Sequence, residues 1–206
     1  MSETILEMKH ATRHADALKS FSRKLLRQQE IPELTLMDPL TALVRACLSY
    51  DTTESRADDA MKTIHTEFVD LNELRVATEL EVIEMIGPRY PDIEARVSQF
   101  ITCLNAIFAR EHSLTLDRVR TLPKREIRSF LRELPGIHPF VEAYTMLFGF
   151  GGHAFPVDQT ILRTLTDEGI IEQGTSLLEA QKFLEQQLKD DEVYRFFYAL
   201  RHRKKR

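Results

Sequence analysis

The fold is decided by the stretch from Leu134 to Asp158, LPGIHPFVEAYTMLFGFGGHAFPVD. A tight turn over residues 134–138 leads into an apolar run that begins with Pro139. Proline suits the first position of a helix, because it lacks the amide hydrogen that would be unpaired there. We therefore expect a hairpin followed by a helix over residues 139–148. A glycine-rich turn comes next, and the single acid Asp158 precedes a further helical segment.

The turn at residues 134–138 has the features of an anion site. Gly136 supplies the backbone freedom of a sharp turn and leaves amide N–H groups uncovered by a Cβ atom. A turn that enters a helix N-terminus directs N–H groups and the positive end of the helix dipole at one point, which suits a phosphate. An ordinary corner between two helices remains the alternative, since Leu-Pro-Gly is common at such corners.

Asp158 has two compatible interpretations. In the segment VDQTILRTL it stands where an N-cap is expected, ahead of the apolar residues Ile161, Leu162 and Leu165. Its carboxylate is also a candidate catalytic group at the mouth of a helix.

Helical periodicity extends over most of the chain, and turn signals surround all seven glycines. We expect an all-α fold. Two helix starts carry clear signals, which are Asp38 before Pro39 and the capping box of Thr78 with Glu81. One helix or a pair of helices is expected over residues 4–28. The other expected helices cover residues 39–48, 54–68, 78–86, 91–108, 123–133, 139–148, 159–168, 176–188 and 191–201.

Composition is that of an ordinary globular protein, with 43% hydrophobic and 29% charged residues in 206. There is no apolar run near the roughly 18 residues that span a bilayer and no signal-peptide pattern, so we expect a cytoplasmic protein. Cys47 and Cys103 lie in apolar helical segments and predict buried thiols. Two cysteines cannot build a disulfide framework or a four-cysteine metal site, so we expect no metal and no cofactor.

The net charge of −4 and the pI near 6.0 argue mildly against tight DNA binding. Two basic segments stand out, and a solvated surface is the simpler interpretation of each. Their residues are Lys19, Arg23, Lys24 and Arg27 near the amino terminus, and Arg201, Arg203, Lys204, Lys205 and Arg206 at the carboxyl terminus.

The hairpin, the glycine-rich turn and the Val157-Asp158 pair together resemble the helix-hairpin-helix DNA glycosylases, the superfamily of endonuclease III. The resemblance covers about residues 36–200. It implies two helical lobes with a cleft between them and Asp158, the catalytic acid for a flipped base, at its lip. It also implies that the hairpin binds a DNA phosphate through Leu134, Gly136, Ile137 and His138.

The same resemblance suggests how the chain is divided. It implies an N-terminal segment over residues 1–35 that packs on the second lobe, and a first lobe over about 38–133. The hairpin and catalytic-type segment would cover residues 134–168. The C-terminal helices would cover residues 176–201, and a basic tail residues 201–206.

Two further turns resemble parts of the superfamily that enter DNA. The helix starting at Asp38 resembles one that ends in a glutamine-containing turn, and here that turn holds Tyr50 and Asp51. The segment IGPRY resembles a turn that carries a wedge residue, for which Arg89 and Tyr90 are candidates. The remaining pocket candidates are Phe140, Tyr144 and His153, with core positions for the two aromatics and a surface position for His153 as alternatives.

Three departures from the superfamily refine the prediction. Phe140 stands where bifunctional members have a lysine, so no Schiff base can form and strand cleavage is not expected. His138 replaces the second hairpin glycine, and a positive φ there would cost about 1–2 kcal/mol. Asp51 would bring negative charge towards DNA. The iron–sulfur cluster common in the endonuclease III branch is not expected either.

These features predict a monomeric, monofunctional DNA glycosylase of base excision repair. Its partner would be double-stranded DNA with a damaged or mismatched base, and a carboxylate would stabilise the positive charge that develops on the sugar. The competing hypothesis is a non-catalytic helix-hairpin-helix module that binds DNA or protein. An open cleft holding the Asp158 carboxylate favours catalysis, whereas a carboxylate consumed as a cap beneath Phe140 and Tyr144 argues against it.

Overall fold

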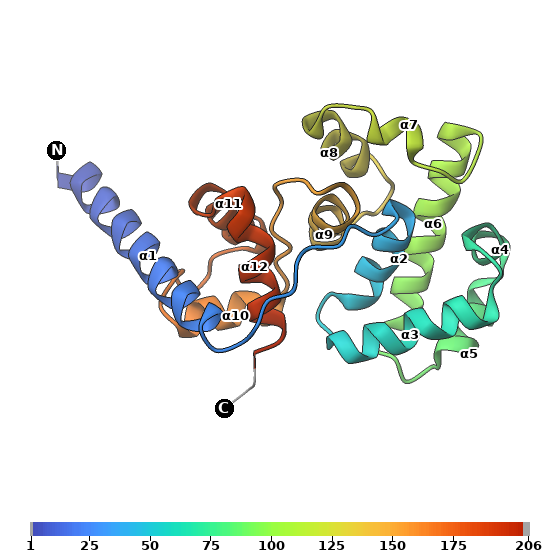
Figure 1. Cartoon of the computed structure of the whole chain (residues 1–206), viewed down its shortest axis with the longest axis horizontal. Helices are drawn as coiled ribbons and strands as arrows, with labels where there is room; N and C mark the ends of the chain where they lie inside the picture. Colours follow the sequence, from blue (N-terminus) through green and yellow to red (C-terminus); the bar gives the residue numbers. More distant parts are fainter. Residues whose placement is uncertain (1, 204–206) are drawn as a thin grey trace. The chain divides into compact units, whose positions relative to one another are not determined.

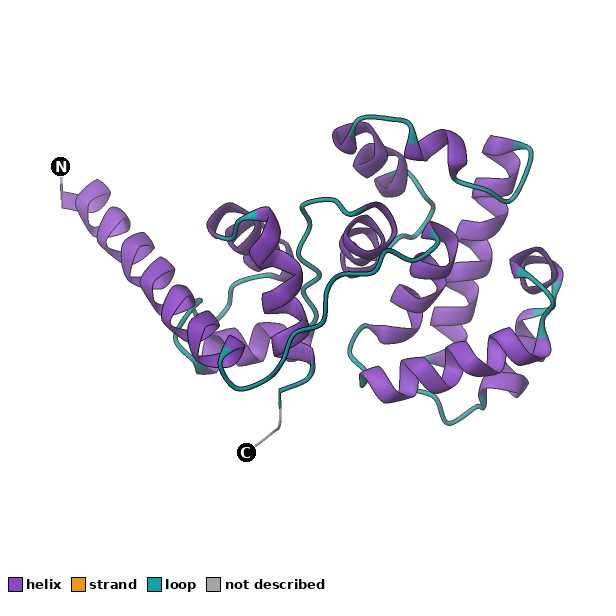
Figure 2. Cartoon of the chain, viewed as in Figure 1, coloured by secondary structure: helices purple, strands orange, loops and turns teal. Residues whose placement is uncertain are grey.

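The computed structural model describes residues 2–203, with side chains from residue 13 onward. Helices and loops account for all of this part of the chain, and no strand occurs in it (Figure 2). None of its helices is long and apolar enough to cross a membrane. The helices are α1 (Ser2–Leu26), α2 (Pro39–Ser49), α3 (Glu54–Glu67), α4 (Leu71–Val76), α5 (Glu79–Ile86), α6 (Ile93–Glu111), α7 (Asp117–Arg120), α8 (Lys124–Arg132), α9 (Pro139–Phe150), α10 (Gln159–Asp167), α11 (Leu177–Gln187) and α12 (Asp190–Arg201).

The prediction of an all-α fold is confirmed, and every expected helix is present. Helix α6 begins at Ile93 and not at Pro91 as predicted, because Asp92 takes the left-handed conformation with φ of 49° and turns the chain first. Two short helices, α4 and α7, were not expected. With six and four residues they are too short to show a helical period.

Both predicted helix starts are confirmed. Asp38 caps α2 by accepting hydrogen bonds from the backbone N–H groups of Leu40 and Thr41, at 2.9 and 3.1 Å. Thr78 and Glu81 form the capping box of α5, in which the Thr78 hydroxyl accepts from the Glu81 N–H and the Glu81 carboxylate accepts from the Thr78 N–H.

The chain forms two compact units (Figure 1). The second unit is continuous in sequence, from Thr35 to Pro156, and its core lies where α2 packs on α9 and on α6. Helix α9 is buried on all sides from Phe140 to Phe150. Gly149 permits the close approach of α9 to α2, since a Cβ atom there would lie only 2.9 Å from the Pro39 Cα atom.

The first unit combines the two ends of the chain, from the start to Leu34 and from Val157 onward. Helix α1 packs on α12, and the Phe21 and Phe196 rings meet edge to face with centroids 6.2 Å apart. The Gln29 side chain donates to the Ala199 carbonyl at 2.8 Å. Buried apolar side chains from α10 and α11 complete this core, among them Ile161, Leu165, Ala180 and Leu184.

Candidate functional site

The hairpin lies between α8 and α9 in the second unit. Leu134 is buried and anchors the turn, while Gly136 is exposed with φ of +67°. A Cβ atom at Gly136 would meet nothing within 4 Å, so glycine is favoured there by the backbone conformation and not by lack of space. The Ile137 N–H donates to the Leu134 carbonyl at 3.3 Å, and the Gln99 amide donates to the Gly136 carbonyl at 2.7 Å.

His138 is the N-cap of α9 and has φ of −75°. The prediction of a positive φ at His138 is therefore wrong. The left-handed residue of the turn is Gly136, and the backbone is extended again at His138. The imidazole Nδ1 atom accepts a hydrogen bond from the Phe140 N–H at 3.1 Å. The side chain thus compensates for the missing second glycine by capping the helix, and it occupies one of the amides at the helix start.

The two hairpin helices are joined by a buried acid. Glu142, in the first turn of α9, accepts hydrogen bonds from Arg128 and Arg132 of α8, with N–O distances of 2.6 and 3.3 Å. The glutamate side chain is 5% exposed. A buried carboxylate with two guanidinium partners fixes the angle between the helices on either side of the turn.

The chain that leads into the hairpin is basic, in contrast to the whole protein. Six cations stand against three acids between residues 117 and 133, although the net charge of the chain is −4. The cations are Arg118, Arg120, Lys124, Arg125, Arg128 and Arg132, and the acids are Asp117, Glu126 and Glu133. These cations were not predicted as a group, because they are spread over two short helices and the segment between them. Four of these cations are paired with acids from other parts of the unit, Arg118 with Glu111, Arg120 with Asp38, and Arg128 and Arg132 with Glu142. The exposed Lys124 and Arg125 therefore carry most of the local positive charge that DNA could meet.

Aromatic side chains connect the hairpin to the turn after α2. The Tyr50 ring stacks on the His138 ring, with centroids 4.8 Å apart and planes 8° apart. The Phe140 ring lies 6.2 Å from the Tyr50 ring. Tyr90, from the turn after α5, donates its hydroxyl hydrogen to the Leu48 carbonyl at 2.6 Å. Burial raises the pKa of the Tyr50 and Tyr90 hydroxyls, although the charge of Arg96 acts in the opposite direction.

Other predicted pocket and wedge residues are more peripheral. Asp51 is exposed and takes the left-handed conformation with φ of 51°, and Arg89 is exposed in the turn after α5. His153 is half-buried in the loop after α9.

Phe140 and Tyr144 are buried along α9, with 0% and 2% of each residue exposed. Their rings and that of Phe148 form a row with centroid separations of 5.8 and 4.2 Å. The Tyr144 hydroxyl accepts a hydrogen bond from Arg45 Nε at 2.9 Å. In this arrangement both residues contribute to the core of the second unit, the alternative that the sequence left open.

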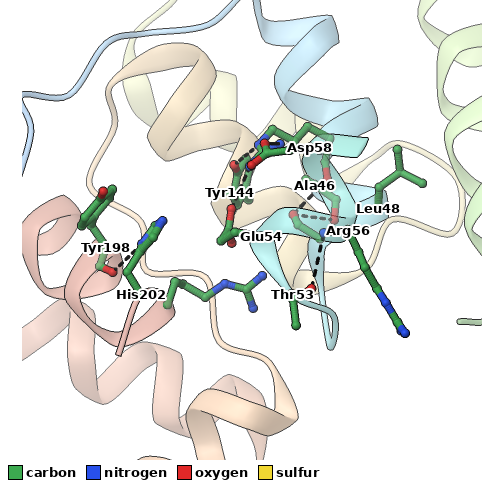
Figure 3. Close-up of polar contacts among 12 residues, drawn as sticks. Ala46, Leu48, Thr53, Glu54, Arg56, Asp58, Tyr144, Tyr198 and His202 are labelled. Atoms are coloured by element: carbon green, nitrogen blue, oxygen red, sulfur yellow. Dashed lines mark hydrogen bonds and ion pairs between the residues drawn. The ribbon is translucent and has the colours of Figure 1, made fainter. Parts of the chain in front are cut away.

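Arg45 extends that contact into a network with two acids of α3. Its guanidinium bonds Glu54 at 2.7 Å and Asp58 at 2.6 Å, and Figure 3 shows both acids close to Tyr144. Burial acts against the Arg45 charge, but the Tyr144 oxygen and the two carboxylates outweigh it and raise the pKa of the guanidinium. The network ties α2, α3 and α9 together.

Asp158 lies in the first unit and both of its carboxylate oxygens have partners. Oδ1 accepts from the Ile161 N–H at 2.8 Å, which caps α10, and Oδ2 lies 2.7 Å from Arg201 Nη1. The exposed fractions of the Asp158 and Arg201 side chains are 0% and 5%. Asp158 is therefore both an N-cap and half of a buried ion pair.

Arg201 was expected in the basic tail, but it belongs to the last turn of α12 and faces inward. A signal for this exists in the sequence, since Arg201 follows the buried residues Val193 and Phe197 at helical spacing. An arginine that continues an apolar stripe indicates a buried partner of opposite charge. At the end of α12 the Tyr198 ring stacks on that of the C-cap residue His202 with centroids 3.9 Å apart, and the His202 Nδ1 atom lies 2.9 Å from the Tyr198 carbonyl (Figure 3).

The chain matches no protein-family model and no curated protein sequence. It does match solved structures. A trapped covalent complex of endonuclease III with DNA superposes with a TM-score of 0.72 at 16% identity, over 90% of this chain and 84% of the other. The Clostridium acetobutylicum 8-oxoguanine glycosylase/lyase, in complex with double-stranded DNA, gives a TM-score of 0.70 at 19% identity, over 91% and 69%.

A third match is the H. pylori 3-methyladenine DNA glycosylase bound to 1,N6-ethenoadenine, with a TM-score of 0.66 at 16% identity, over 93% of this chain and 94% of the other. The chain therefore has the fold of the endonuclease III-like helix-hairpin-helix DNA glycosylases, as the sequence predicted. Proteins with this fold differ in their chemistry through the residues at the site.

Proposed function

We propose that this protein binds double-stranded DNA through its hairpin as a monomer, and that Asp158 serves the structure of the first unit instead of base excision. Binding is preferred over base excision because both Asp158 oxygens already accept hydrogen bonds, one from the Ile161 N–H and the other from Arg201.

A carboxylate that stabilises a sugar cation must direct an uncompensated negative charge at the reacting carbon. The charge of Asp158 is already balanced by a guanidinium at 2.7 Å. Separating a buried ion pair costs about 3–5 kcal/mol, which would have to be recovered from DNA binding before any catalysis began. The pair therefore argues against Asp158 as a resident catalyst.

The residue at position 140 also argues against base excision with strand cleavage. Phe140 has no amine to form a Schiff base, and its side chain is fully buried against other aromatics. Position 158 therefore offers no unpaired carboxylate for hydrolysis, and position 140 offers no amine for lyase chemistry.

DNA binding is supported by the hairpin and its surroundings. The exposed left-handed Gly136 precedes the N-terminus of a helix of 12 residues, which is a favourable place for a phosphate oxygen. Lys124 and Arg125, exposed in the first turn of α8, add attraction for the backbone of a duplex. The other four cations of residues 117–133 are paired with acids of the same unit and contribute less. Similar structures were solved as complexes with DNA.

A second candidate is a monofunctional glycosylase in which the Asp158–Arg201 pair opens when DNA binds. It is favoured by the place of Asp158 at the N-terminus of α10, where the helix dipole supports a negative charge. In that case the damaged or mismatched base would be hydrolysed from the sugar and released.

One pair of measurements separates these functions. The first is a titration with duplex DNA that contains an uncleavable abasic-site analogue, and with intact duplex, at two salt concentrations. The second is a base-release assay on duplexes containing uracil, 3-methyladenine, 8-oxoguanine or a mismatch, with the native protein and Asp158→Asn. We expect salt-dependent binding and no base release.

The other outcomes are equally informative. Base release by the native protein that is lost in Asp158→Asn would establish the glycosylase and refute the structural role of the acid. An absence of binding to both duplexes would exclude DNA as a partner and leave a protein-interaction domain with this fold.

A further inference from the structure

Arg96, on α6 of the second unit, is a buried cation for which the described part of the chain provides no counter-ion. It is 0% exposed, and no carboxylate pairs with it among the described residues. Its Nε atom donates to the Pro91 carbonyl at 2.7 Å and Nη1 donates to the Cys47 carbonyl at 2.8 Å. Nη2 is buried without a hydrogen-bond partner in this part of the chain.

Burying a guanidinium in this way is costly, and an apolar side chain of similar volume would avoid the cost. Three contacts offset part of it. Cys47 lies near the C-terminal end of α2, where the helix dipole favours a cation, and the Pro91 carbonyl adds a second acceptor. The third is the Tyr50 ring, whose centroid lies 4.0 Å from the guanidinium carbon.

These contacts link separate segments to the hairpin. Through Pro91, Arg96 holds the turn after α5, and through Cys47 and Tyr50 it holds the end of α2 and the turn that follows. Tyr50 in turn stacks on His138, the residue that caps α9 at the hairpin. The order of contacts is Arg96, Tyr50, His138, and then the first amide of the hairpin's second helix.

We propose that Arg96 is a positioning residue for DNA binding, which fixes the hairpin in its binding conformation through Tyr50 and His138. This inference rests on the proposed DNA binding. Because the hairpin is held in place beforehand, binding need not supply the free energy to order it. Arg96 itself is buried and touches no phosphate, so its effect is on the strength of binding and not on the number of ionic contacts.

The test compares two properties of the DNA titration, the affinity and its dependence on salt. Arg96→Met removes the charge and both hydrogen bonds, and we expect about 10-fold weaker binding at each salt concentration with an unchanged salt slope. Arg125→Gln removes an exposed cation of α8, and its salt slope should fall by about 1 if that cation meets a phosphate. Arg96→Lys should bind DNA with intermediate affinity. Lysine keeps the positive charge, but its single ammonium group cannot donate to both carbonyls as the two guanidinium nitrogens do.

Two further variants exclude a loss of stability as the cause. Val82→Ala shortens a fully buried side chain of α5 in the same unit, away from the hairpin, and should leave the affinity unchanged. Tyr50→Leu leaves Arg96 in place but removes the ring between Arg96 and His138, and should weaken binding as Arg96→Met does.

Each alternative result has one meaning. Equal losses in Arg96→Met and Val82→Ala would reduce Arg96 to a general stabilising residue, and a smaller salt slope in Arg96→Met would make it a direct phosphate contact. If the native protein binds DNA and Arg96→Met binds it equally well, this inference is overturned and the proposed function is not. Failure of the native protein to bind DNA would overturn the proposed function and this inference together.

Discussion

Arg201 Nη1 lies 2.7 Å from the Asp158 Oδ2 atom, in a pair whose two side chains are 5% and 0% exposed. The contact joins the first residue before α10 to the last turn of α12, across 43 positions of sequence. The carboxylate that the sequence marks as a catalytic candidate is thus part of the framework of the first unit. This gives it a measurable role in stability, whatever its role in chemistry.

Arg201→Met should lower the free energy of unfolding by about 3–5 kcal/mol, because it leaves the Asp158 charge buried without its partner. Denaturant unfolding measures this directly. Arg203→Gln is the matched control, since the Arg203–Glu168 pair is about one-third exposed and should contribute under about 1 kcal/mol. Similar decreases in the free energy of unfolding for the two variants would mean that the Asp158–Arg201 pair contributes no more to stability than an exposed ion pair.

The double variant Asp158→Asn with Arg201→Met should be more stable than Arg201→Met alone. Asparagine keeps an oxygen that can cap α10, and it removes the charge that lost its partner. A thermodynamic cycle over the four proteins gives the coupling energy between the two side chains. Additive effects in this cycle would contradict a direct interaction.

Gly149→Ala should destabilise the protein by about 1–3 kcal/mol, although alanine is normally the better helix former. The added Cβ atom would lie 2.9 Å from the Pro39 Cα atom. The backbones of α2 and α9 would have to move apart to relieve this contact, which would loosen the core. Gly136→Ala is a useful comparison, because its Cβ atom has free space and its cost of about 1–2 kcal/mol comes from the positive φ alone. A stabilised Gly149→Ala protein would show that α2 and α9 are not in close contact.

Cys47 and Cys103 should resist alkylation at pH 8 in the folded protein. Burial raises the pKa of both thiols, that of Cys103 to about 11, so the reactive thiolate is scarce at this pH. Mass spectrometry after iodoacetamide treatment should find no addition without denaturant and two additions with it. Rapid labelling of the folded protein would place at least one thiol on an accessible surface.

The capping boxes of α5 and α11 should weaken in acid. Hydrogen bonds from Thr78 and Ser176 lower the pKa of Glu81 and Glu179 below their ordinary values. A lowered carboxyl pKa means that the stabilisation is present above the ordinary pKa and disappears as the pH falls through the lowered one. The protection of amides from exchange at the start of these helices should therefore decrease as the pH falls below the ordinary glutamate pKa, and Glu179→Gln should remove this pH dependence at α11.

The sequence predicted those parts of the molecule that depend on local chemistry. Asp38 and Thr78 mark their helices because a cap needs only the next three residues, and the hairpin follows from Gly136 and Pro139 in the same way. The conformation of His138 was not predictable by this reasoning, because an imidazole can cap a helix as well as interrupt a turn. The buried positions of Arg96 and Arg201 were not predicted, because Cys47 and Asp158, which they contact, are 49 and 43 positions away and charged residues are ordinarily expected at the surface.

The division of the chain into one continuous and one discontinuous unit has a consequence for the order of folding. Residues 35–156 have all their unit's partners within one stretch, so they can fold while later residues are still being added. Helix α1 can pack into its unit only after the end of the chain has been made, because the unit depends on contacts such as that between Gln29 and Ala199, 170 positions apart. Closing so long a loop is slow. During synthesis, the apolar face of α1 around Leu18 and Phe21 therefore stays exposed until the end of the chain is made, and it needs protection from aggregation for that time.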